Sequence, residues 1–189
     1  MVAIQLETLK TEIWGWLGSA ADDRDDPFRT PAVATAGLDG TPQARIVVLR
    51  EVEAAEWSLD FYTDIRSPKC EELMKSQAAT WLFYDATRQI QIRALSTASM
   101  HTSDAVADRA WAWSALASRA IYASASSPGA AIDAPMPSVF LHDDTEAEHG
   151  RRNFCVVRCR VHEFDVLQLH PGRHRRACVR PDGAQWWMP

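Results

Sequence analysis

Short runs of alternating apolar and polar residues constrain the fold of this chain more than any other feature of its sequence. In Arg88–Leu95, Ile90 and Ile92 would face one side of a strand, and Gln89 and Gln91 the other. Such alternation is typical of antiparallel strands with one wet or ligand-facing side. Similar runs and apolar β-branched runs predict further strands over residues 32–36, 43–50, 57–63, 79–84, 154–164, 177–180 and 185–188.

Turn and helix signals divide these strands. Asp39-Gly40 lies between the first two strands and is typical of a tight hairpin. Helices are predicted over about 3–18, 67–76 and 102–122, the first ended by Gly18 and Ser19. Antiparallel strands interrupted by helices favour a mainly β fold with flanking helices, as a closed or split barrel. The alternation alone does not separate a barrel from a sandwich.

Composition narrows the class of protein. A length of 189 residues with 47% apolar residues suits one domain over residues 1–189. The net charge of −5 argues against a nucleic-acid-binding surface. Without a secretory signal or a run of about 20 apolar residues, we expect a soluble cytoplasmic protein with no membrane partner. We expect the four cysteines to be reduced and mostly buried: Cys70, Cys155, Cys159 and Cys178.

Several familiar site motifs are missing from the sequence. It has no GxSxG, HExxH or Walker phosphate loop, and no GxGxxG after a strand. The six histidines are scattered without metal-ligand spacing, so we expect no metal site. Hydrolase, Rossmann and metal chemistry are therefore disfavoured.

Arg45–Arg50 places two cations around four apolar residues of an expected strand. Positions five apart in a regular strand face opposite sides, so the two arginines should not share one site unless a bulge or a second subunit intervenes. A buried strand with charged ends is the alternative.

The segment Tyr62–Lys69 runs from the end of a strand into the start of a helix. A helix start offers free backbone N–H groups and the positive end of the dipole, and Arg66 and Lys69 add charge there. This pattern is that of a phosphate site or of an ordinary capped helix.

Two further polar runs are candidates for binding. The side-chain amides within Arg88–Arg93 could hydrogen-bond a planar heterocycle, or they could lie on a solvated strand face. The basic run from His170 to Arg176 is suited to an anion or to a solvated loop.

The order and spacing of these runs resemble the pyridoxamine 5′-phosphate oxidase family. The shared pattern is Arg-x-Val-x-Leu, Tyr-Thr about a dozen residues later, Ser-x-Lys, Arg-Gln-Ile, a late Arg cluster and a final Met-Pro. It covers roughly residues 30–189 and is strongest over 43–95. The resemblance implies an FMN-binding split β-barrel that forms a homodimer with flavin at the subunit interface.

Carried over residue by residue, the resemblance implies that Arg45 and Lys69 contact the FMN phosphate, with Ser67 nearby. Pro68 stands where the family pattern has a cation, and Arg66 would replace it. The other flavin contacts that the resemblance implies are the backbone of Ile46, Val47, Val48 and Leu49, then Arg50, Tyr62, Thr63, Gln89 from the facing subunit, Ser127 and Arg176.

The substrate half of the pattern matches less well. The segment that holds the substrate in the family aligns with Arg109–Ser118, whose residue types differ. Arg50, Arg173 and His174 are the remaining candidates for substrate contacts, and no residue is singled out as catalytic.

Four functions stay open. The resemblance favours an FMN-dependent oxidase or reductase that acts on an undetermined small molecule. A flavin sensor or store, a true pyridoxamine/pyridoxine 5′-phosphate oxidase, and a barrel that binds no flavin are the alternatives.

Overall fold

The fold is organised around one long strand, β7 (Phe154–Gln168). The computed structural model describes residues 4–135, 144–169 and 171–189. Among these residues, nine strands form one antiparallel sheet. The others are β1 (Ala32–Ala36), β2 (Pro42–Ile46), β3 (Glu51–Glu53), β4 (Ser58–Asp64), β5 (Ala78–Asp85), β6 (Ile90–His101), β8 (Arg175–Arg180) and β9 (Gly183–Trp187).

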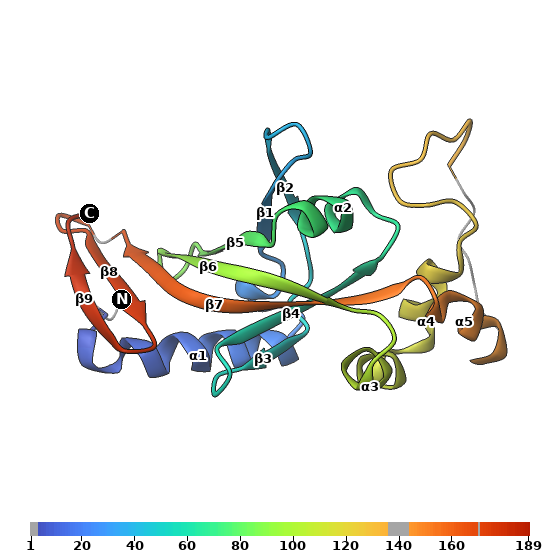
Figure 1. Cartoon of the computed structure of the whole chain (residues 1–189). Coiled ribbons are helices and arrows are strands. Elements are labelled where there is room, and N and C mark those ends of the chain that lie inside the picture. The colour runs from blue at the N-terminus through green and yellow to red at the C-terminus, as the bar shows by residue number, and fades with distance from the viewer. Residues whose placement is uncertain (1–3, 136–143, 170) are drawn as a thin grey trace.

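The strand order is β2-β1-β5-β6-β7-β4-β3, and β8 and β9 continue from β7. The first half of β7 pairs with β4 and its second half with β8, while β6 follows its other edge. The sheet is not closed, which is consistent with the predicted split barrel. Figure 1 shows β7 crossing the molecule, with β8 and β9 at one end and several helices at the other.

The helices are α1 (Leu6–Asp22), α2 (Pro68–Lys75), α3 (Ala105–Trp113), α4 (Leu116–Arg119) and α5 (Asp144–Arg151), with short 3-10 turns η1 (Pro27–Arg29) and η2 (Ala120–Ala123). α1 lies beneath the sheet, and α3, α4 and α5 gather at one end of β7 (Figure 1). No helix within the described ranges has the length and apolarity to cross a membrane. α5 was not predicted, and the expected helix over 102–122 is broken at Ser114 and Ala115.

The prediction of one continuous strand over 43–50 is wrong. β2 ends at Ile46, and the Val47 and Leu49 amides donate to the carbonyls of Pro31 and Arg29. The Arg50 amide then donates to the Asp60 carbonyl, beside β4. The chain thus leaves the β1 side of the barrel and joins the β4 side within this segment.

The prediction that Gly18 and Ser19 end the first helix is also wrong, because α1 continues to Asp22. A helical glycine costs about 1 kcal/mol relative to alanine. Leu17 and Ala20 on either side of Gly18 are fully buried in the core, and this packing outweighs the weak local propensity.

The main core joins α1 to the inner faces of the strands. Its largest fully buried side chains include Trp81, Phe28, Phe61 and Phe83. Trp81 and Phe83 stack with an interplanar angle of 4°. A second buried cluster packs α3 and η2 against the start of β7: Ala110, Trp111, Tyr122, Phe154 and Val156.

Candidate functional site

A cluster of polar side chains lies where β4 ends and α2 begins. The Lys69 ammonium donates to the Thr63 hydroxyl at 3.0 Å and to the Ser67 hydroxyl at 3.2 Å. Ser67 and Thr63 are buried, and Pro68 at the first helical position fits its fixed φ. This cluster, with Arg45, is called the cationic cradle below.

Burial lowers the pKa of Lys69 from its ordinary value of 10.5, and the neighbouring Arg45 charge lowers it further. The charged ammonium is therefore held in partly desolvated surroundings beside another cation. An anion placed here relieves both penalties. Two cations, two hydroxyls and a helix N-terminus form the donor set that phosphate groups use, so the residues fit an FMN phosphate.

Arg45 reaches the cradle from β2 and is held by two partners. Its guanidinium donates to the Thr35 hydroxyl and lies 2.7 Å from Glu72 of α2. The Glu72 carboxylate is buried and also accepts from Thr35. The cradle is thus partly neutralised, and Glu72 fixes the direction of Arg45.

Arg66, predicted to stand in for a missing phosphate cation, is bound to Asp64. Two nitrogens of its guanidinium lie 3.0 and 2.7 Å from the two carboxylate oxygens. It also donates to the carbonyl of Ser124. The structure therefore places Arg66 between β4 and the loop that carries Ser127.

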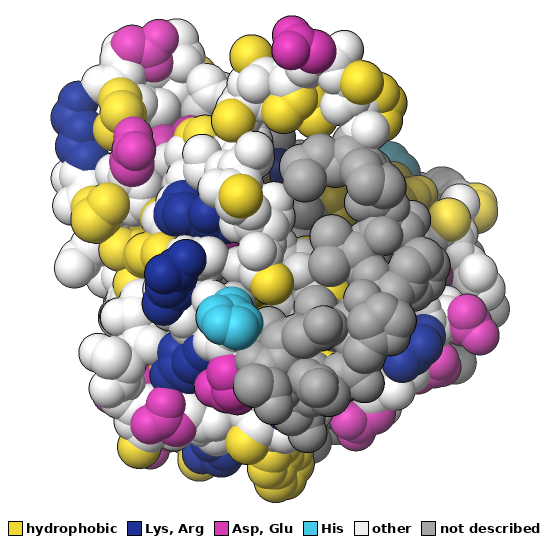
Figure 2. Space-filling model, turned by 90° about the vertical axis from the view of Figure 1, so that its right-hand side faces the viewer, with side chains coloured by type: hydrophobic (Ala, Val, Ile, Leu, Met, Phe, Trp, Pro, Cys, Tyr) yellow, Lys and Arg dark blue, Asp and Glu magenta, His cyan; other side chains and the backbone are white. Residues whose placement is uncertain are grey.

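That loop lies against the cradle. A side chain at Gly129 would meet the ring of Pro68 at 3.5 Å, and Gly129 has a φ of +86°. Ser127, half-buried two residues earlier, therefore lies near the start of α2. Figure 2 faces this end of the molecule, where several Lys and Arg side chains lie close together.

Other residues predicted to contact the flavin lie away from the cationic cradle. Gln89 precedes β6, and its carbonyl accepts from the Leu169 amide, just beyond β7. Arg176 of β8 binds Asp165 through two nitrogens, each at 2.8 Å. Arg173 and His174 are exposed just before β8, and His170 lies outside the described residues.

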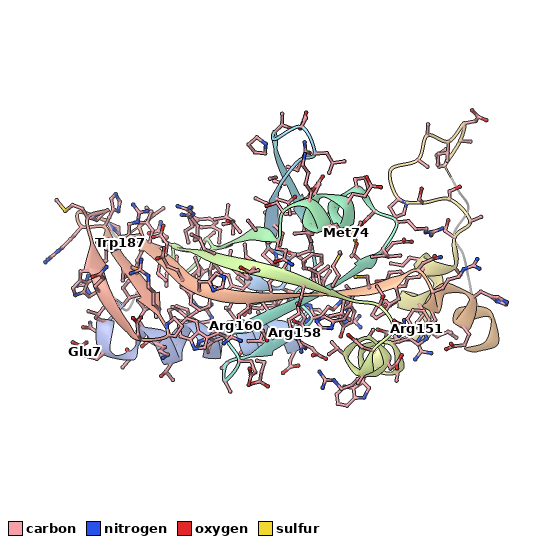
Figure 3. All side chains as sticks on the ribbon, viewed as in Figure 1. Glu7, Met74, Arg151, Arg158, Arg160 and Trp187 are labelled. Atoms are coloured by element: carbon pink, nitrogen blue, oxygen red, sulfur yellow. The ribbon has the colours of Figure 1, made fainter. Side chains whose placement is uncertain are left out.

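The two groups of predicted residues are separated along β7. Thr63 pairs with Cys155 near one end of β7, and Arg176 pairs with Leu167 near the other. Twelve steps of about 3.3 Å each correspond to roughly 40 Å of strand. In Figure 3, Trp187, which lies under the Arg176 guanidinium, marks one end of the molecule and Arg151 the other. One subunit therefore does not bring the two groups together.

Arg50 faces neither group. Its guanidinium lies over the Tyr62 ring, 5.5 Å from the centroid. Both residues line a cavity of about 870 Å³ that is separate from the cradle contacts. The break after β2 thus sends Arg45 and Arg50 to different places, for a reason other than the alternation of one regular strand on which the sequence argument rested. Of the backbone segment expected along the flavin, Ile46 is exposed, Val47 and Leu49 are buried, and Val48 is intermediate.

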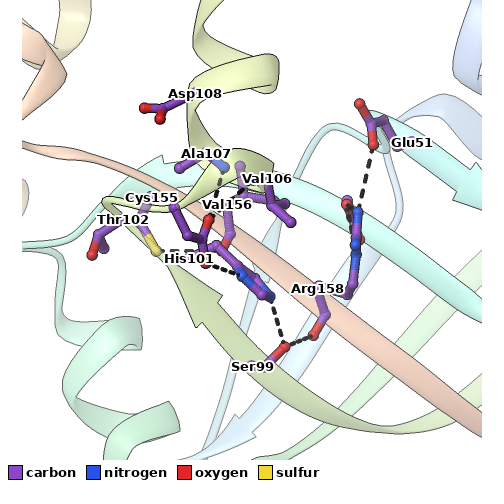
Figure 4. A network of polar contacts seen from close by, with 12 residues as sticks. Glu51, Ser99, His101, Thr102, Val106, Ala107, Asp108, Cys155, Val156 and Arg158 are labelled. Atoms are coloured by element: carbon purple, nitrogen blue, oxygen red, sulfur yellow. Dashed lines mark hydrogen bonds and ion pairs between the residues drawn. The ribbon is translucent and has the colours of Figure 1, made fainter.

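A further polar network joins β6 to α3 (Figure 4). The Ser99 hydroxyl lies 3.1 Å from Nε2 of His101, and Nδ1 of His101 lies 2.7 Å from Asp104. Desolvation acts to raise the pKa of Asp104, but hydrogen bonds from His101 and the α3 amides outweigh it and lower the pKa. Because Asp104 also caps α3 and Ser99 donates to the Arg158 carbonyl, this network has a structural role.

Three acidic or hydroxyl residues at these sites were not predicted: Thr35, Glu72 and Asp165. Each became a partner only through tertiary pairing, since Thr35 and Glu72 are 37 positions apart. Burial of an acidic residue on a short helix would have been the signal for Glu72. The sequence alone does not show that Glu72 is buried.

The comparisons with known proteins point to one family. The model of the pyridoxamine 5′-phosphate oxidase FMN-binding domain matches residues 13–102. A pyridoxine/pyridoxamine 5′-phosphate oxidase of Thermosynechococcus vestitus is 30% identical over 185 residues, which cover 90% of this chain and 82% of that protein. One of Paracoccus denitrificans is 34% identical over 82 residues, 41% of this chain and 37% of that protein. The chain belongs to the pyridoxamine 5′-phosphate oxidase family.

Solved structures show the same fold. A pyridoxamine 5′-phosphate oxidase-related, FMN-binding protein of Nostoc punctiforme has a TM-score of 0.73 at 18% identity. The match covers 98% of this chain and 100% of that protein's chain. PhzG of Burkholderia lata, solved with tetrahydrophenazine-1-carboxylic acid, has a TM-score of 0.72 at 21% identity. The match covers 95% of this chain and 91% of PhzG.

Proposed function

We propose that this protein binds FMN and acts as an FMN-dependent oxidoreductase on a small molecule. The cationic cradle carries the proposal, because its half-buried lysine and arginine and its buried hydroxyls match the chemistry of a phosphate. When bound, FMN supplies the redox chemistry by accepting and returning electrons. The chain's own residues anchor the phosphate, orient the flavin and shape the space beside it.

Within the cradle, each residue has a separate task. Lys69 supplies a charge whose partial desolvation strengthens its attraction for an anion. Thr63 and Ser67 hold the ammonium in place, and Glu72 directs Arg45. Arg66 and Asp64 hold the loop with Ser127 beside the start of α2.

We also propose a homodimer with flavin at the subunit interface. The separation along β7 supports it, because Gln89 and Arg176 of one subunit lie far from its own cradle, and those of a second copy would reach it. An apolar sheet face offers the contact. Ile46 and Leu82 both pair with Ala32 across three adjacent strands, and they are 65% and 41% exposed. A second copy of the chain would cover this face.

The cytoplasm is the location we propose. The four cysteines are free and buried, as in proteins that remain in a reducing compartment.

An absorption spectrum of the purified protein with and without added FMN tests the proposal first. We expect a bound-flavin spectrum. Anaerobic addition of pyridoxine phosphate, and then of reduced nicotinamide cofactors, identifies the electron donor by bleaching. Bleaching by pyridoxine phosphate would identify a true pyridoxine phosphate oxidase, and stable binding without bleaching a flavin store or sensor. Absence of flavin uptake would contradict the proposal.

A further inference from the structure

A buried carboxylate on β7 holds two arginines from the neighbouring strands. Asp165 is 4% exposed, and its oxygens lie 2.8 Å from both Nε and Nη2 of Arg176 on β8. Nη1 of Arg93 on β6 lies 3.2 Å from the same carboxylate. Burial of a lone carboxylate is costly, and the two guanidinium groups offset that cost. Because two cations surround one anion, the group remains cationic.

The register of the sheet does not by itself bring Asp165 and Arg176 together. Arg176 lies opposite Leu167, and Asp165 lies opposite Cys178. The arginine side chain therefore leans along β8 to reach a diagonal neighbour. Trp187 lies opposite Arg176 on β9, with its ring centroid 5.6 Å from the guanidinium carbon (Figure 3). The carboxylate and the indole hold the guanidinium from two sides, an arrangement called the clamp below.

The clamp leaves one end of the Arg176 guanidinium unused. Nε and Nη2 both donate to Asp165, whereas Nη1 has no hydrogen bond or ion pair with any residue that the structure describes. The guanidinium is planar and rigid, so fixing its Nε–Nη2 edge also fixes the direction of Nη1. Asp165 therefore determines where the two hydrogens of Nη1 point.

The clamp lies on the sheet face that we propose for the dimer. Directly opposed residues of an antiparallel sheet have their side chains on the same face. One such row crosses five strands: Ile46, Ala32, Leu82, Arg93 and Asp165. The next row contains the arginine of the clamp: Tyr84, Gln91, Leu167, Arg176 and Trp187.

The two rows lie on one face, because Gln91 and Arg93 are two positions apart on β6. Arg176 thus shares a face with the exposed side chains of Ile46 and Leu82, which a second copy would cover.

We propose that Asp165 is a positioning residue of the flavin site, which directs the free Nη1 donors of Arg176 across the interface toward the flavin bound by the second copy. Arg176 makes the contact, and Asp165 acts through it without touching the flavin. The inference rests on the proposed FMN binding and the proposed dimer. It goes beyond them because it assigns the direction of the arginine to one carboxylate.

The charge of Asp165 and its positioning role have opposite effects on FMN binding. Asp165→Asn removes a negative charge, so electrostatics alone strengthens the binding of anionic FMN. Loss of direction weakens binding, because the Nη1 donors must then be ordered when FMN binds. We expect FMN to bind at least about threefold more weakly to Asp165→Asn, as measured by fluorescence titration of the flavin-free protein. An unchanged or lower Kd would overturn the proposal.

Glu163→Gln is the matched control. Glu163 precedes Asp165 by two positions on β7 and lies 2.9 and 2.5 Å from two nitrogens of Arg180 on β8. The variant removes the same kind of pair between the same two strands, and we expect it to keep the FMN affinity of the unmodified protein. An equal loss in both variants would overturn the proposal, because any broken pair between β7 and β8 would then loosen the site.

A double-mutant cycle separates positioning from a general structural effect. If Asp165 acts through Arg176, adding Asp165→Asn to an Arg176→Gln protein changes the Kd by less than about twofold. The same loss in both backgrounds would mean that Asp165 does not act through Arg176.

Arg176→Lys keeps the test open if Asp165→Asn does not fold, because it retains the carboxylate and a cation beside it. Lysine keeps the charge but lacks the rigid fork that the clamp directs. We expect this variant to bind FMN as weakly as Arg176→Gln does. Full FMN affinity in Arg176→Lys would overturn the proposal, since charge without direction would then suffice.

The midpoint potential of the bound flavin is a second readout. A cation fixed beside the flavin favours its reduced, more negatively charged state. Release of Arg176 in Asp165→Asn should therefore lower the potential, whereas removal of a negative charge alone raises it. A raised potential would contradict the positioning role.

Failure of the proposed function is recognised in the unmodified protein. If that protein takes up no FMN, the proposed function and this inference both fail. If it binds FMN and the Kd of Asp165→Asn does not rise, only this inference fails. Light scattering completes the test, because an Asp165→Asn protein that is a monomer while the unmodified protein is a dimer would show that Asp165 maintains the assembly and does not position Arg176.

Discussion

Lys69 and Thr63 are joined by a hydrogen bond of 3.0 Å that ties the first turn of α2 to the end of strand β4. The same ammonium contacts Ser67, so both hydroxyls of the cradle hold one cation. Because Thr63 and Ser67 are buried, the ammonium has few positions available to it. The charge is therefore positioned before a ligand arrives, which reduces the entropy lost on binding.

We predict that Lys69→Ala weakens FMN binding. A hydrogen bond to a charged group contributes about 1.5–3 kcal/mol, which corresponds to roughly ten- to a hundredfold in Kd. Fluorescence titration of FMN measures the change. Lys75→Ala is the matched control, because it removes an exposed lysine from the same helix. An unchanged Kd for Lys69→Ala would exclude the phosphate assignment.

We also predict that FMN affinity falls at alkaline pH. The pKa of Lys69 is below 10.5 in the free protein because of burial and Arg45, and a bound phosphate dianion raises it again. Binding then takes up a proton, so affinity decreases as the pH rises through the pKa of the free protein. Titrations from about pH 7.5 to 10.5 measure this slope.

Lys69→Arg is the control for the pH experiment, since arginine stays charged throughout that range. Any titration of the flavin itself is common to both proteins and cancels in the comparison. Identical slopes for the two proteins would show that Lys69 does not carry the bound proton.

Leu82→Glu should separate the proposed dimer and weaken FMN binding in parallel. The new charge would stand in an apolar face that includes Ile46, where a second copy would desolvate it. Light scattering at micromolar concentration gives the mass, and fluorescence gives the Kd. Leu38→Glu, in the β1–β2 turn and 49% exposed, is the matched control. A Leu82→Glu protein that remains a dimer would exclude this face as the interface.

Asp104→Asn should destabilise the protein at neutral pH and not in acid. The folded-state pKa of Asp104 is below its ordinary 3.8, so its stabilising contribution is complete above that value and is lost as the pH falls through the folded pKa. Denaturant unfolding from about pH 7 to 3 should show a difference that closes below about pH 4. Asp25→Asn, an exposed change of the same charge, should show no such closing difference.

Most of the β elements could be predicted from the sequence, because local alternation determines which residues face the core. β5 at Ala78–Asp85 follows the expected 79–84 closely, and β4 follows 57–63. The break after Ile46 could not be predicted, because Val47 and Leu49 continue the β-branched and apolar pattern. Their hydrogen bonds to 29–31 depend on how the barrel curves.

The candidate site also has a part that could be predicted from the sequence and a part that could not. The phosphate cradle followed from a strand end, a helix start and Lys69, which are neighbours in the sequence. Arg50 was a candidate from the sequence, but the place of Arg29 in the same cavity was not, because the two segments are joined only by tertiary pairing, through the Leu49 amide and the Arg29 carbonyl. The pairing of Arg176 with Asp165 was equally hidden, since it depends on the register of β7 and β8.

Gln89 has a backbone φ of 51°, in the left-handed region that side chains with a β-carbon seldom occupy. This conformation costs about 1–2 kcal/mol for a residue other than glycine, and strained residues of this kind cluster at ligand sites. We predict that Gln89→Gly stabilises the protein by up to about 1 kcal/mol in denaturant unfolding, because the strain relieved exceeds the added chain entropy. The same variant should bind FMN more weakly, because it loses the amide proposed to contact the flavin.

Gln91→Gly is the matched control in the regular part of β6, where glycine should reduce stability and Gln91 has no proposed flavin contact. A Gln89→Gly protein that is more stable and keeps its FMN affinity would mean that the strained conformation serves only the turn into β6.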